Sequence, residues 1–174
     1  KPPPTPSFPP GISIRTVDLA QDARAVFQVD YEAFQDHFGY VAEDPEVGLE
    51  RFLHHMTGES SFDPSLWFVA EEKGKLVGIC LCRSRGYNEA DAGHISSLGV
   101  RRPWRRRGIG LGLLQTAFRE FYCRGYKKVD LEVDAMSLTG AVDLYRKAGM
   151  EVFRQFDLYE KQLRPGREVS VTGL

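Results

Sequence analysis

The sequence predicts a mixed α/β fold in one domain, with the element order β-α-α-β-β-β-α-β-α-β. A chain of 174 residues with 42% apolar and 27% charged residues is typical of one globular unit. Short segments of alternating apolar and polar residues are interspersed with segments of helical periodicity. Glycine and proline mark the ends of these segments, so the elements can be taken in order.

The first elements are one strand and two helices. Ile12–Val17 alternates between apolar and polar residues, which predicts a strand. Asp18–His37 places apolar residues near helical spacing and predicts an amphipathic helix. Pro45–Met56 predicts a second helix, because proline is tolerated in a first turn.

Three strands are expected next. Leu66–Glu71 and Leu76–Cys82 are apolar runs on either side of a turn at Lys73-Gly74. His94–Val100 predicts a further strand. The centre of the domain is therefore expected to be a sheet.

Helices and strands alternate in the C-terminal part. Ile109–Arg124 predicts a helix, since apolar residues recur every four positions and a glycine follows. Lys128–Val133 predicts a strand, and Thr139–Ala148 predicts a short helix that also ends before a glycine. Val152–Lys161 alternates enough to predict one or two final strands.

Both ends of the chain differ from this domain. Residues 1–11 carry six prolines in their first ten positions, which favours an extended polyproline II segment of ~30 Å. We interpret them as a proline-rich linker or tail. Residues 12–163 form the predicted domain, and residues 164–174 form a C-terminal tail.

Charge and cysteine content narrow the class of protein. Lys and Arg number 23 against 24 Asp and Glu, whereas a non-specific nucleic-acid binder carries a large positive excess. Cys80, Cys82 and Cys123 form no disulfide framework or metal-ligand spacing, so we expect buried reduced thiols and a cytoplasmic location. No apolar run approaches ~18 residues and no signal peptide opens the chain, so no membrane partner is expected.

The segment RRPWRRRGIGLG, Arg101 to Gly112, predicts a phosphate site. It joins a strand ending near Val100 to a helix beginning near Gly110, where unpaired backbone donors favour an anion. Arginines add bidentate phosphate contacts. The segment lacks the Gly-Lys-Ser/Thr ending of a P-loop, and its glycines do not match the spacing of a Rossmann fingerprint.

The same segment carries a family resemblance. Arg105–Gly110 matches the acyl-coenzyme A signature Arg/Gln-x-x-Gly-x-Gly/Ala, and it follows a strand in Leu98–Pro103. Leu131–Met150 contains the pattern of a fifth strand and an LY-x-x-x-G helix. From Ile12 to Leu163 the chain resembles the GNAT superfamily of N-acetyltransferases, and it is similar to the C-terminal half of tandem GNAT proteins such as mycothiol synthase.

This resemblance implies a GNAT fold, with a mixed, mostly antiparallel central sheet and helices on both faces. It implies acetyl-CoA as the cosubstrate, with its pyrophosphate on backbone amides and its pantetheine arm paired to a strand. Ser137 stands where relatives commonly have an asparagine that contacts the cofactor. The cofactor-binding residues that the resemblance assigns are Leu98, Gly99, Val100, Arg105, Arg106, Arg107, Gly108, Ile109, Gly110, Leu111 and Ser137.

Two catalytic residues are expected on the same basis. Tyr145 falls on the family's tyrosine, where a phenol protonates the leaving thiolate; the alternative is a core aromatic. His94 falls where one branch carries a catalytic glutamate, and an imidazole with a reference pKa of ~6.5 is a suitable base. The alternative is a histidine at a strand edge with no chemical role. Many relatives place a glutamate at the position of Ser96, and Glu132 could substitute for it.

The resemblance also locates the acceptor site in the loop and helices after the first strand. A mixture of acidic and aromatic residues there suits a polar or cationic acceptor, although a solvated loop is equally compatible with it. These residues are Asp36, His37, Phe38, Tyr40, Glu43 and Asp44. His54 and His55 are expected on an exposed helix face.

The predicted function is transfer of an acetyl group from acetyl-CoA to a primary amine of a small molecule or peptide, by direct attack in a ternary complex. The alternative is a catalytically weak or inactive GNAT module that binds acyl-CoA for structural or regulatory purposes; the serines at Ser96 and Ser137 keep it open. A second GNAT domain upstream and a homodimer are both compatible with the sequence. Nucleic acid is not an expected partner, and no metal is expected.

Overall fold

The computed structural model describes residues 2–35, 43–85, 91–134, 140–157, 159 and 161–164. Its centre is a five-stranded sheet in the order β1-β2-β3-β4-β5. β1 to β4 pair antiparallel, and β5 pairs parallel with β4. The strands are β1 (Ile12–Thr16), β2 (Phe62–Glu72), β3 (Lys75–Arg83), β4 (Ala92–Val100) and β5 (Lys128–Leu131).

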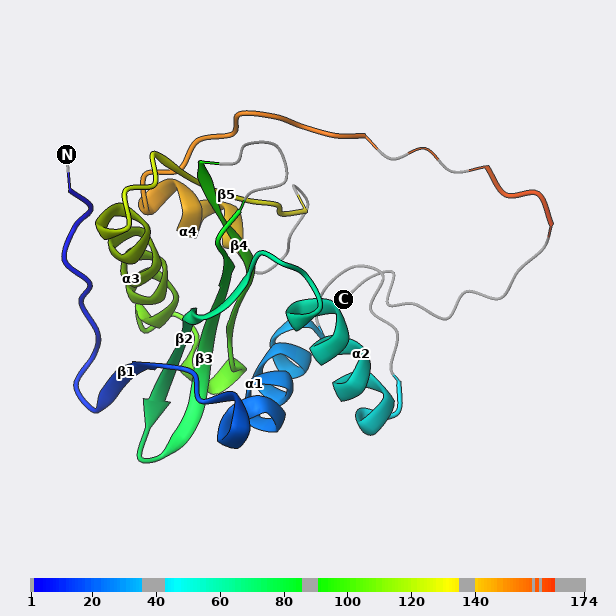
Figure 1. The fold of residues 1–174 in the computed structure, drawn as a ribbon, viewed down its shortest axis with the longest axis horizontal. Helices are drawn as coiled ribbons and strands as arrows, with labels where there is room; N and C mark the ends of the chain where they lie inside the picture. Colours follow the sequence, from blue (N-terminus) through cyan, green and yellow to red (C-terminus); the bar gives the residue numbers. More distant parts are fainter. Residues whose placement is uncertain are drawn as a thin grey trace.

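Helices cover both faces of this sheet, as the resemblance implied (Figure 1). α1 and α2 lie on one face, and α3 and α4 lie on the other. A 3₁₀ turn, η1, joins β4 to α3. The helical elements are α1 (Leu19–Phe34), α2 (Pro45–Thr57), η1 (Arg102–Trp104), α3 (Ile109–Cys123) and α4 (Ala141–Lys147). In the part of the chain that is described, no helix is long and apolar enough to cross a membrane.

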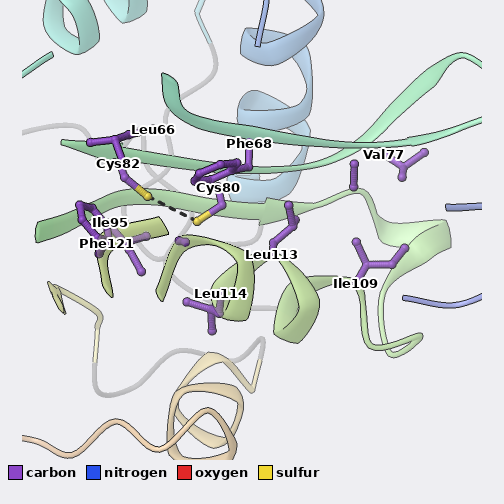
Figure 2. Packing of buried hydrophobic residues seen from close by; sticks show 12 residues of the cluster. Leu66, Phe68, Val77, Cys80, Cys82, Ile95, Ile109, Leu113, Leu114 and Phe121 are labelled. Carbon is purple, nitrogen blue, oxygen red and sulfur yellow. Dashed lines mark hydrogen bonds between the residues drawn. The ribbon is translucent and has the colours of Figure 1, made fainter. Parts of the chain in front are cut away.

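The α3 face of the sheet carries one of the two apolar clusters (Figure 2). Leu113 and Phe121 of α3 pack against Cys80, Cys82 and neighbouring strand residues, all of them buried. The two sulfur atoms lie 3.7 Å apart as free thiols, and burial raises the pKa of Cys82. The expectation of buried free thiols is therefore confirmed for these two cysteines, whereas Cys123 is exposed rather than buried.

Close packing of α3 on the sheet depends on a glycine. A Cβ atom added to Gly93 would lie 2.3 Å from the Phe121 ring, far inside van der Waals contact. Phe121 therefore occupies the space above the strand that any side chain at this position would need.

The second apolar cluster fills the α1 and α2 face and includes Trp67 and Val29. Asp18 caps α1 by accepting from the Ala20 amide, and Asp44 caps α2 by accepting from Glu46, which explains where both helices begin. Asp44 was predicted in the acceptor loop, but its side chain is engaged in this cap.

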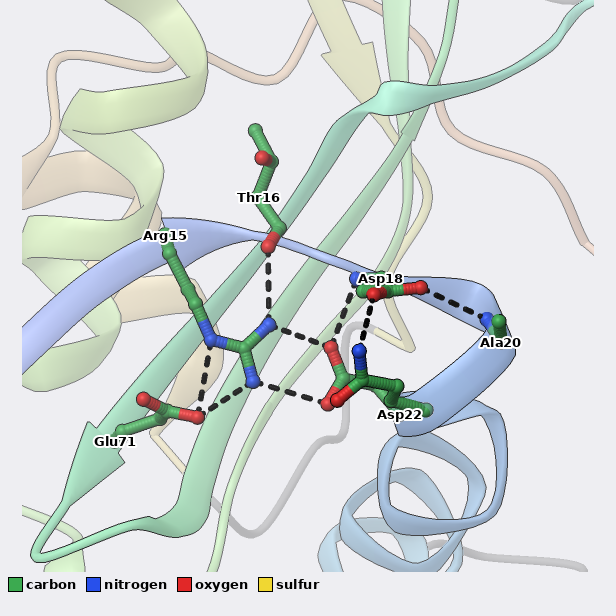
Figure 3. A network of polar contacts seen from close by, with 7 residues as sticks. Arg15, Thr16, Asp18, Ala20, Asp22 and Glu71 are labelled. Atoms are coloured by element: carbon green, nitrogen blue, oxygen red, sulfur yellow. Dashed lines mark hydrogen bonds and ion pairs between the residues drawn. The ribbon is translucent and has the colours of Figure 1, made fainter.

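A polar network ties α1 to the sheet (Figure 3). The Arg15 guanidinium of β1 contacts Asp22 of α1 at 2.5 Å and Glu71 of β2 at 2.6 Å. The backbone amide of Asp18 also donates to Asp22. Hydrogen bonds from Arg15 hold the pKa of Asp22 below its usual value. Three elements are thereby joined at one end of the sheet.

Both ends of the chain differ from the expectation in detail. Phe8 of the proline-rich segment packs against the α3 cluster, and a Cβ on Gly112 would lie 2.4 Å from its ring. The strands predicted over Val152–Lys161 are wrong for the residues described there, which form no ladder. Their large side chains are exposed, Phe153 among them, and this segment runs away from the sheet after α4.

Candidate active site

β4 and β5 pair over only part of their length. Their ladder covers Ala92–Ile95 against Lys128–Leu131, and β5 ends there. The second half of β4, from Ser96 to Val100, has no neighbour on the β5 side among the described residues. The sheet therefore opens into a wedge whose apex lies at Ile95.

Backbone donors face into this wedge. The Arg101 amide donates to the Val77 carbonyl of β3, at 2.9 Å. Because N–H directions alternate along a strand, the Gly99 amide also faces β3, whereas the Leu98 and Val100 amides face the open side. The edge predicted to pair with a pantetheine arm is thus available to an extended ligand that carries its own amide groups.

The open edge leads to the N-terminus of α3. Arg106 and Gly108 have left-handed backbones, with φ of 63° and 86°. The first i→i−4 hydrogen bond of α3 runs from the Gly112 amide to the Gly108 carbonyl. Among the described residues, no amide from position 106 to 111 donates to a backbone acceptor. These amides form an anion cradle, hereafter the α3 cradle.

Two of the five arginines in this turn hold the backbone in place. Arg105 donates to the carbonyls of Val100 and Ala33, at 3.1 and 3.0 Å, and so joins the end of β4 to the end of α1. Arg101 is buried and lies 3.4 Å from the Glu32 carboxylate. Through these contacts with β4 and α1, both side chains support the turn that carries the α3 cradle.

The remaining arginines differ in their partners. Arg107 pairs with Glu72 at 2.9 Å, and Trp104 donates to the same carboxylate at 2.7 Å. The Arg106 guanidinium has no hydrogen-bond or ion-pair partner among the described residues, and it lies 3.4 Å from the Cβ position of Gly140. Arg106 is therefore the arginine best placed to contact a phosphate at the cradle.

Tyr145 lies on α4, on the α3 side of the sheet. It packs against the apolar cluster on this face, as Leu98 and Val100 of β4 also do. Burial raises the pKa of Tyr145 to about 12, with a smaller contribution from Cys80. The phenol therefore carries its proton at neutral pH and can donate it.

His94 lies on the opposite face of the sheet from Tyr145. Its neighbours Gly93 and Ile95 face Phe121 on the α3 side, so alternation turns His94 toward the α1 and α2 side. The side chain is buried, with Nδ1 2.6 Å from Asp130 of β5. A carboxylate in this position orients the imidazole ring.

A cavity of about 250 Å³ opens on that same face, between α1, α2 and the sheet. Its walls combine apolar side chains with charged and hydroxyl groups. The lining residues are Asp30, Phe34, Phe52, His55, Met56, Arg83, Ser96 and Ser97. The cavity therefore reaches β4 at the point where the wedge begins.

Asp30 is the carboxylate among the described residues that line this cavity. The Ser97 hydroxyl donates to its carboxylate at 2.5 Å. Burial raises the pKa of Asp30 to about 6, and the hydrogen bond from Ser97 opposes that shift. The sequence analysis did not single out Asp30. It lies four residues after the buried Val26 and one residue after the buried Val29, and so belongs to the apolar stripe of α1.

Other cavity residues had partial signals in the sequence. The Ser96 hydroxyl is buried and has no hydrogen-bond partner among the described residues, and it is not a base. His55 lies on the exposed part of α2, as expected, but it also lines the cavity. Arg83 is buried, contacts Glu59 at 2.5 Å and donates to the His55 carbonyl at 3.1 Å.

For several of the predicted site residues, the described structure gives no contact with the cavity or the α3 cradle. Glu43 pairs with Arg51 instead of facing the cavity, and Glu132 is exposed. The others lie outside the described residues. These are Asp36, His37, Phe38, Tyr40 and Ser137.

Comparison with known proteins gives a consistent result. A family model described as "Acetyltransferase (GNAT) family" matches residues 23–150. A mycothiol acetyltransferase of Streptomyces coelicolor is 32% identical over 148 residues, covering 84% of this chain and 45% of that protein.

Solved structures agree with this match. A GCN5-related N-acetyltransferase from Sphaerobacter thermophilus is 44% identical with a TM-score of 0.71, over 87% of this chain and 44% of that one. An aminoglycoside N-acetyltransferase solved with CoA has a TM-score of 0.65 at 13% identity, over 87% of this chain and 95% of that one, which shows a shared fold. The chain spans less than half the length of the mycothiol acetyltransferase and of the Sphaerobacter protein.

Proposed function

Because the chain belongs to the GNAT acetyltransferase family, we propose that it transfers an acetyl group from acetyl-CoA to a primary amine of a small molecule or peptide. The observation that carries this proposal is the open edge of β4, with the α3 cradle after its C-terminal end and the cavity lined by Ser96 and Ser97 at its start. A ligand with a diphosphate at one end and a reactive group at the other fits this path.

The residues present fit acetyl-CoA. Amides of the α3 cradle would hold the pyrophosphate, and Arg106 would add a charged contact. The amides of Leu98 and Val100 would pair with the pantetheine arm like an added strand. Of the other arginines assigned from the sequence, Arg105 and Arg107 support the turn through their protein partners.

Catalysis would then occur where the wedge narrows. An arm anchored at the α3 cradle and lying along β4 presents its thioester near Ser96 and Ser97, beside the cavity. The acceptor amine enters from the α1 and α2 face, and its nitrogen attacks the thioester carbonyl. A β4 amide such as that of Leu98 would stabilise the oxyanion, and Tyr145 would protonate the leaving thiolate from the other face.

His94 is the base that the sequence proposed. Its contact with Asp130 suits an imidazole that accepts a proton. It lies within the paired part of β4, three residues before Ser97, which corresponds to ~10 Å of strand. It would take a proton from the amine only through solvent in the cavity, so a basic group that lines the cavity would act more directly.

A thiol-release assay across a panel of primary amines tests the activity. We expect CoA release from acetyl-CoA that depends on the acceptor, together with an acetylated product detected by mass spectrometry. Tight CoA binding without acceptor-dependent release across a broad panel would instead support a non-catalytic acyl-CoA-binding module.

Two neighbouring arginines provide a matched test of the cofactor site. Arg106→Ala should weaken CoA binding about tenfold, because it removes a charged contact to phosphate. Arg107→Ala should change CoA binding little, since that side chain is paired with Glu72. Isothermal titration with CoA measures both variants, and equal losses in the two would contradict the assignment of Arg106.

We also propose a cytoplasmic location, which the two buried free thiols Cys80 and Cys82 support by suiting a reducing compartment. The similarity to half of a longer acetyltransferase supports a second domain as a partner, and a homodimer remains the alternative. Size-exclusion chromatography with light scattering distinguishes a monomer from a dimer.

A further inference from the structure

The Asp30 carboxylate is an isolated negative charge in the cavity wall. It is partly buried, and the Ser97 hydroxyl is its one hydrogen-bond partner among the described residues. No arginine, lysine or histidine of the described chain forms an ion pair with it, although Arg83 and His55 line the same cavity. A carboxylate that loses part of its water without gaining a cation is costly for the fold, so a ligand that brings a cation is favoured at this position.

The position of Asp30 relates it to the reacting atoms. Its hydrogen-bond partner Ser97 belongs to β4 at the start of the open edge, where the proposed path delivers the thioester. His94, by contrast, lies inside the paired part of the strand and does not line the cavity. Of the described residues, Asp30 is therefore the carboxylate that lines the cavity where the acceptor nitrogen would sit.

We propose that Asp30 binds the ammonium group of the acceptor and accepts its proton, so that the neutral amine can attack. This inference rests on the proposed acetyl transfer and names its substrate class, a primary ammonium next to an apolar segment. The apolar segment would pack against Phe34, Phe52 and Met56, which form the rest of the wall. Ser97 is a positioning residue, because it orients the carboxylate without contacting the acceptor.

The proton balance of the step is closed. The ammonium gives one proton to Asp30, which later releases it to solvent. As the C–N bond forms and the C–S bond breaks, the nitrogen loses a second proton, and this proton replaces the one that Tyr145 gives to the sulfur. The products are one amide, one thiol and one released proton, and no oxidant, reductant or metal is required.

The titration of Asp30 suits this role. Burial raises its pKa to about 6, so the carboxylate is charged at neutral pH yet is a stronger base than an exposed aspartate. The other titratable groups that face this region are His55 of α2, Arg83 of β3 and His94 of β4. The test therefore has to separate the two histidines from Asp30.

The test is the pH dependence of kcat/KM for the acceptor in the full chain with saturating acetyl-CoA. The wild-type value should rise with pH through an apparent pKa near 6, because protonated Asp30 neither binds the ammonium nor accepts its proton. Asp30→Asn should lower kcat/KM about 10²-fold and remove this acidic limb, while CoA affinity stays unchanged.

The Ser97→Ala variant separates a role of Ser97 in orienting Asp30 from a purely structural role, because only the former moves the acidic limb. The Ser97 hydrogen bond lowers the pKa of Asp30, so its loss should move the acidic limb to higher pH. His55→Gln and His94→Gln should leave the limb in place. A limb that disappears in either histidine variant, or stays fixed in Ser97→Ala, would overturn the proposal.

A matched control lies on the same helix. Asp22 is also a buried acid of α1, but it pairs with Arg15 far from the cavity. Asp22→Asn should reduce the urea midpoint and keep the acidic limb, whereas Asp30→Asn should raise the midpoint at pH 7 because it removes an uncompensated charge. Wild-type protein without acceptor-dependent turnover would count against the acetyl transfer itself. Normal turnover with an unchanged profile in Asp30→Asn would count against Asp30 alone.

Discussion

At the scale of single residues, Tyr145 combines burial with a position beside the open edge of β4. Burial raises its pKa to about 12, so the phenol is a proton donor rather than a base at neutral pH. Tyr145→Phe removes the acidic proton and preserves the aromatic packing. We expect kcat to fall about 10²-fold while CoA affinity stays within twofold of wild type. Pre-steady-state thiol release and CoA titration measure the two quantities, and an unchanged kcat would contradict the role of Tyr145.

Among single residues, prediction from sequence depended on neighbours in the chain. Tyr145 and the α3 cradle could be singled out from sequence because each belongs to a contiguous motif with fixed spacing, and their roles stay predictions. Asp30 could not, because its role depends on Ser97, which is 67 positions away in the sequence. An acid on an amphipathic helix is usually solvated, so only its place in the buried stripe signalled an exception.

At the scale of elements, α3 is held against the sheet by the contact of Gly93 with Phe121. Gly93→Ala would place a methyl group 2.3 Å from the ring, so we expect about 1–3 kcal/mol of destabilisation from overpacking. Urea unfolding measures this loss. The double variant with Phe121→Leu should be more stable than the sum of the two single losses predicts, because the smaller side chain leaves room for the methyl group. Simple additivity would mean that the ring is not the obstacle.

Helices and strands were predicted well from sequence where the local residue pattern alone determines the element. Helices α1 and α2 begin at capping aspartates, whereas α3 and α4 begin after glycines. The five strands of the sheet were all anticipated within a few residues of their bounds. The prediction over Val152–Lys161 was wrong because alternation describes a strand only when another strand is there to pair with it. In this segment the alternating side chains, Phe153 and Phe156 included, are exposed.

At the scale of the whole molecule, the Arg15 network links the neighbouring strands β1 and β2 to α1. The folded-state pKa of Asp22 is lowered by Arg15, so its stabilising contribution is present above the unfolded-state pKa of ~3.9 and is lost as the pH falls through the lower folded value. Arg15→Met should therefore destabilise the fold at pH 7, and the difference from wild type should shrink at pH 2.5. Urea unfolding at both pH values measures it.

The control for that prediction is an ion pair outside the network. Arg24 and Glu46 are also paired, at 2.6 Å, but both side chains are mostly exposed. Arg24→Met should leave stability nearly unchanged at either pH, because solvent screens exposed pairs. Equal effects of the two arginine variants would show that the Arg15 network gains nothing from its partial burial.

The wedge between β4 and β5 has one more consequence. Its mouth is the α3 cradle and its apex is the closed ladder at Ile95 and Leu131, so both ends are fixed by the fold. A flexible arm bound at the α3 cradle can extend only as far as the closed ladder. The length of the open β4 edge therefore limits how deep a bound ligand can reach. Acyl groups that exceed the allowed depth would be rejected by the backbone itself, whichever acceptor is present.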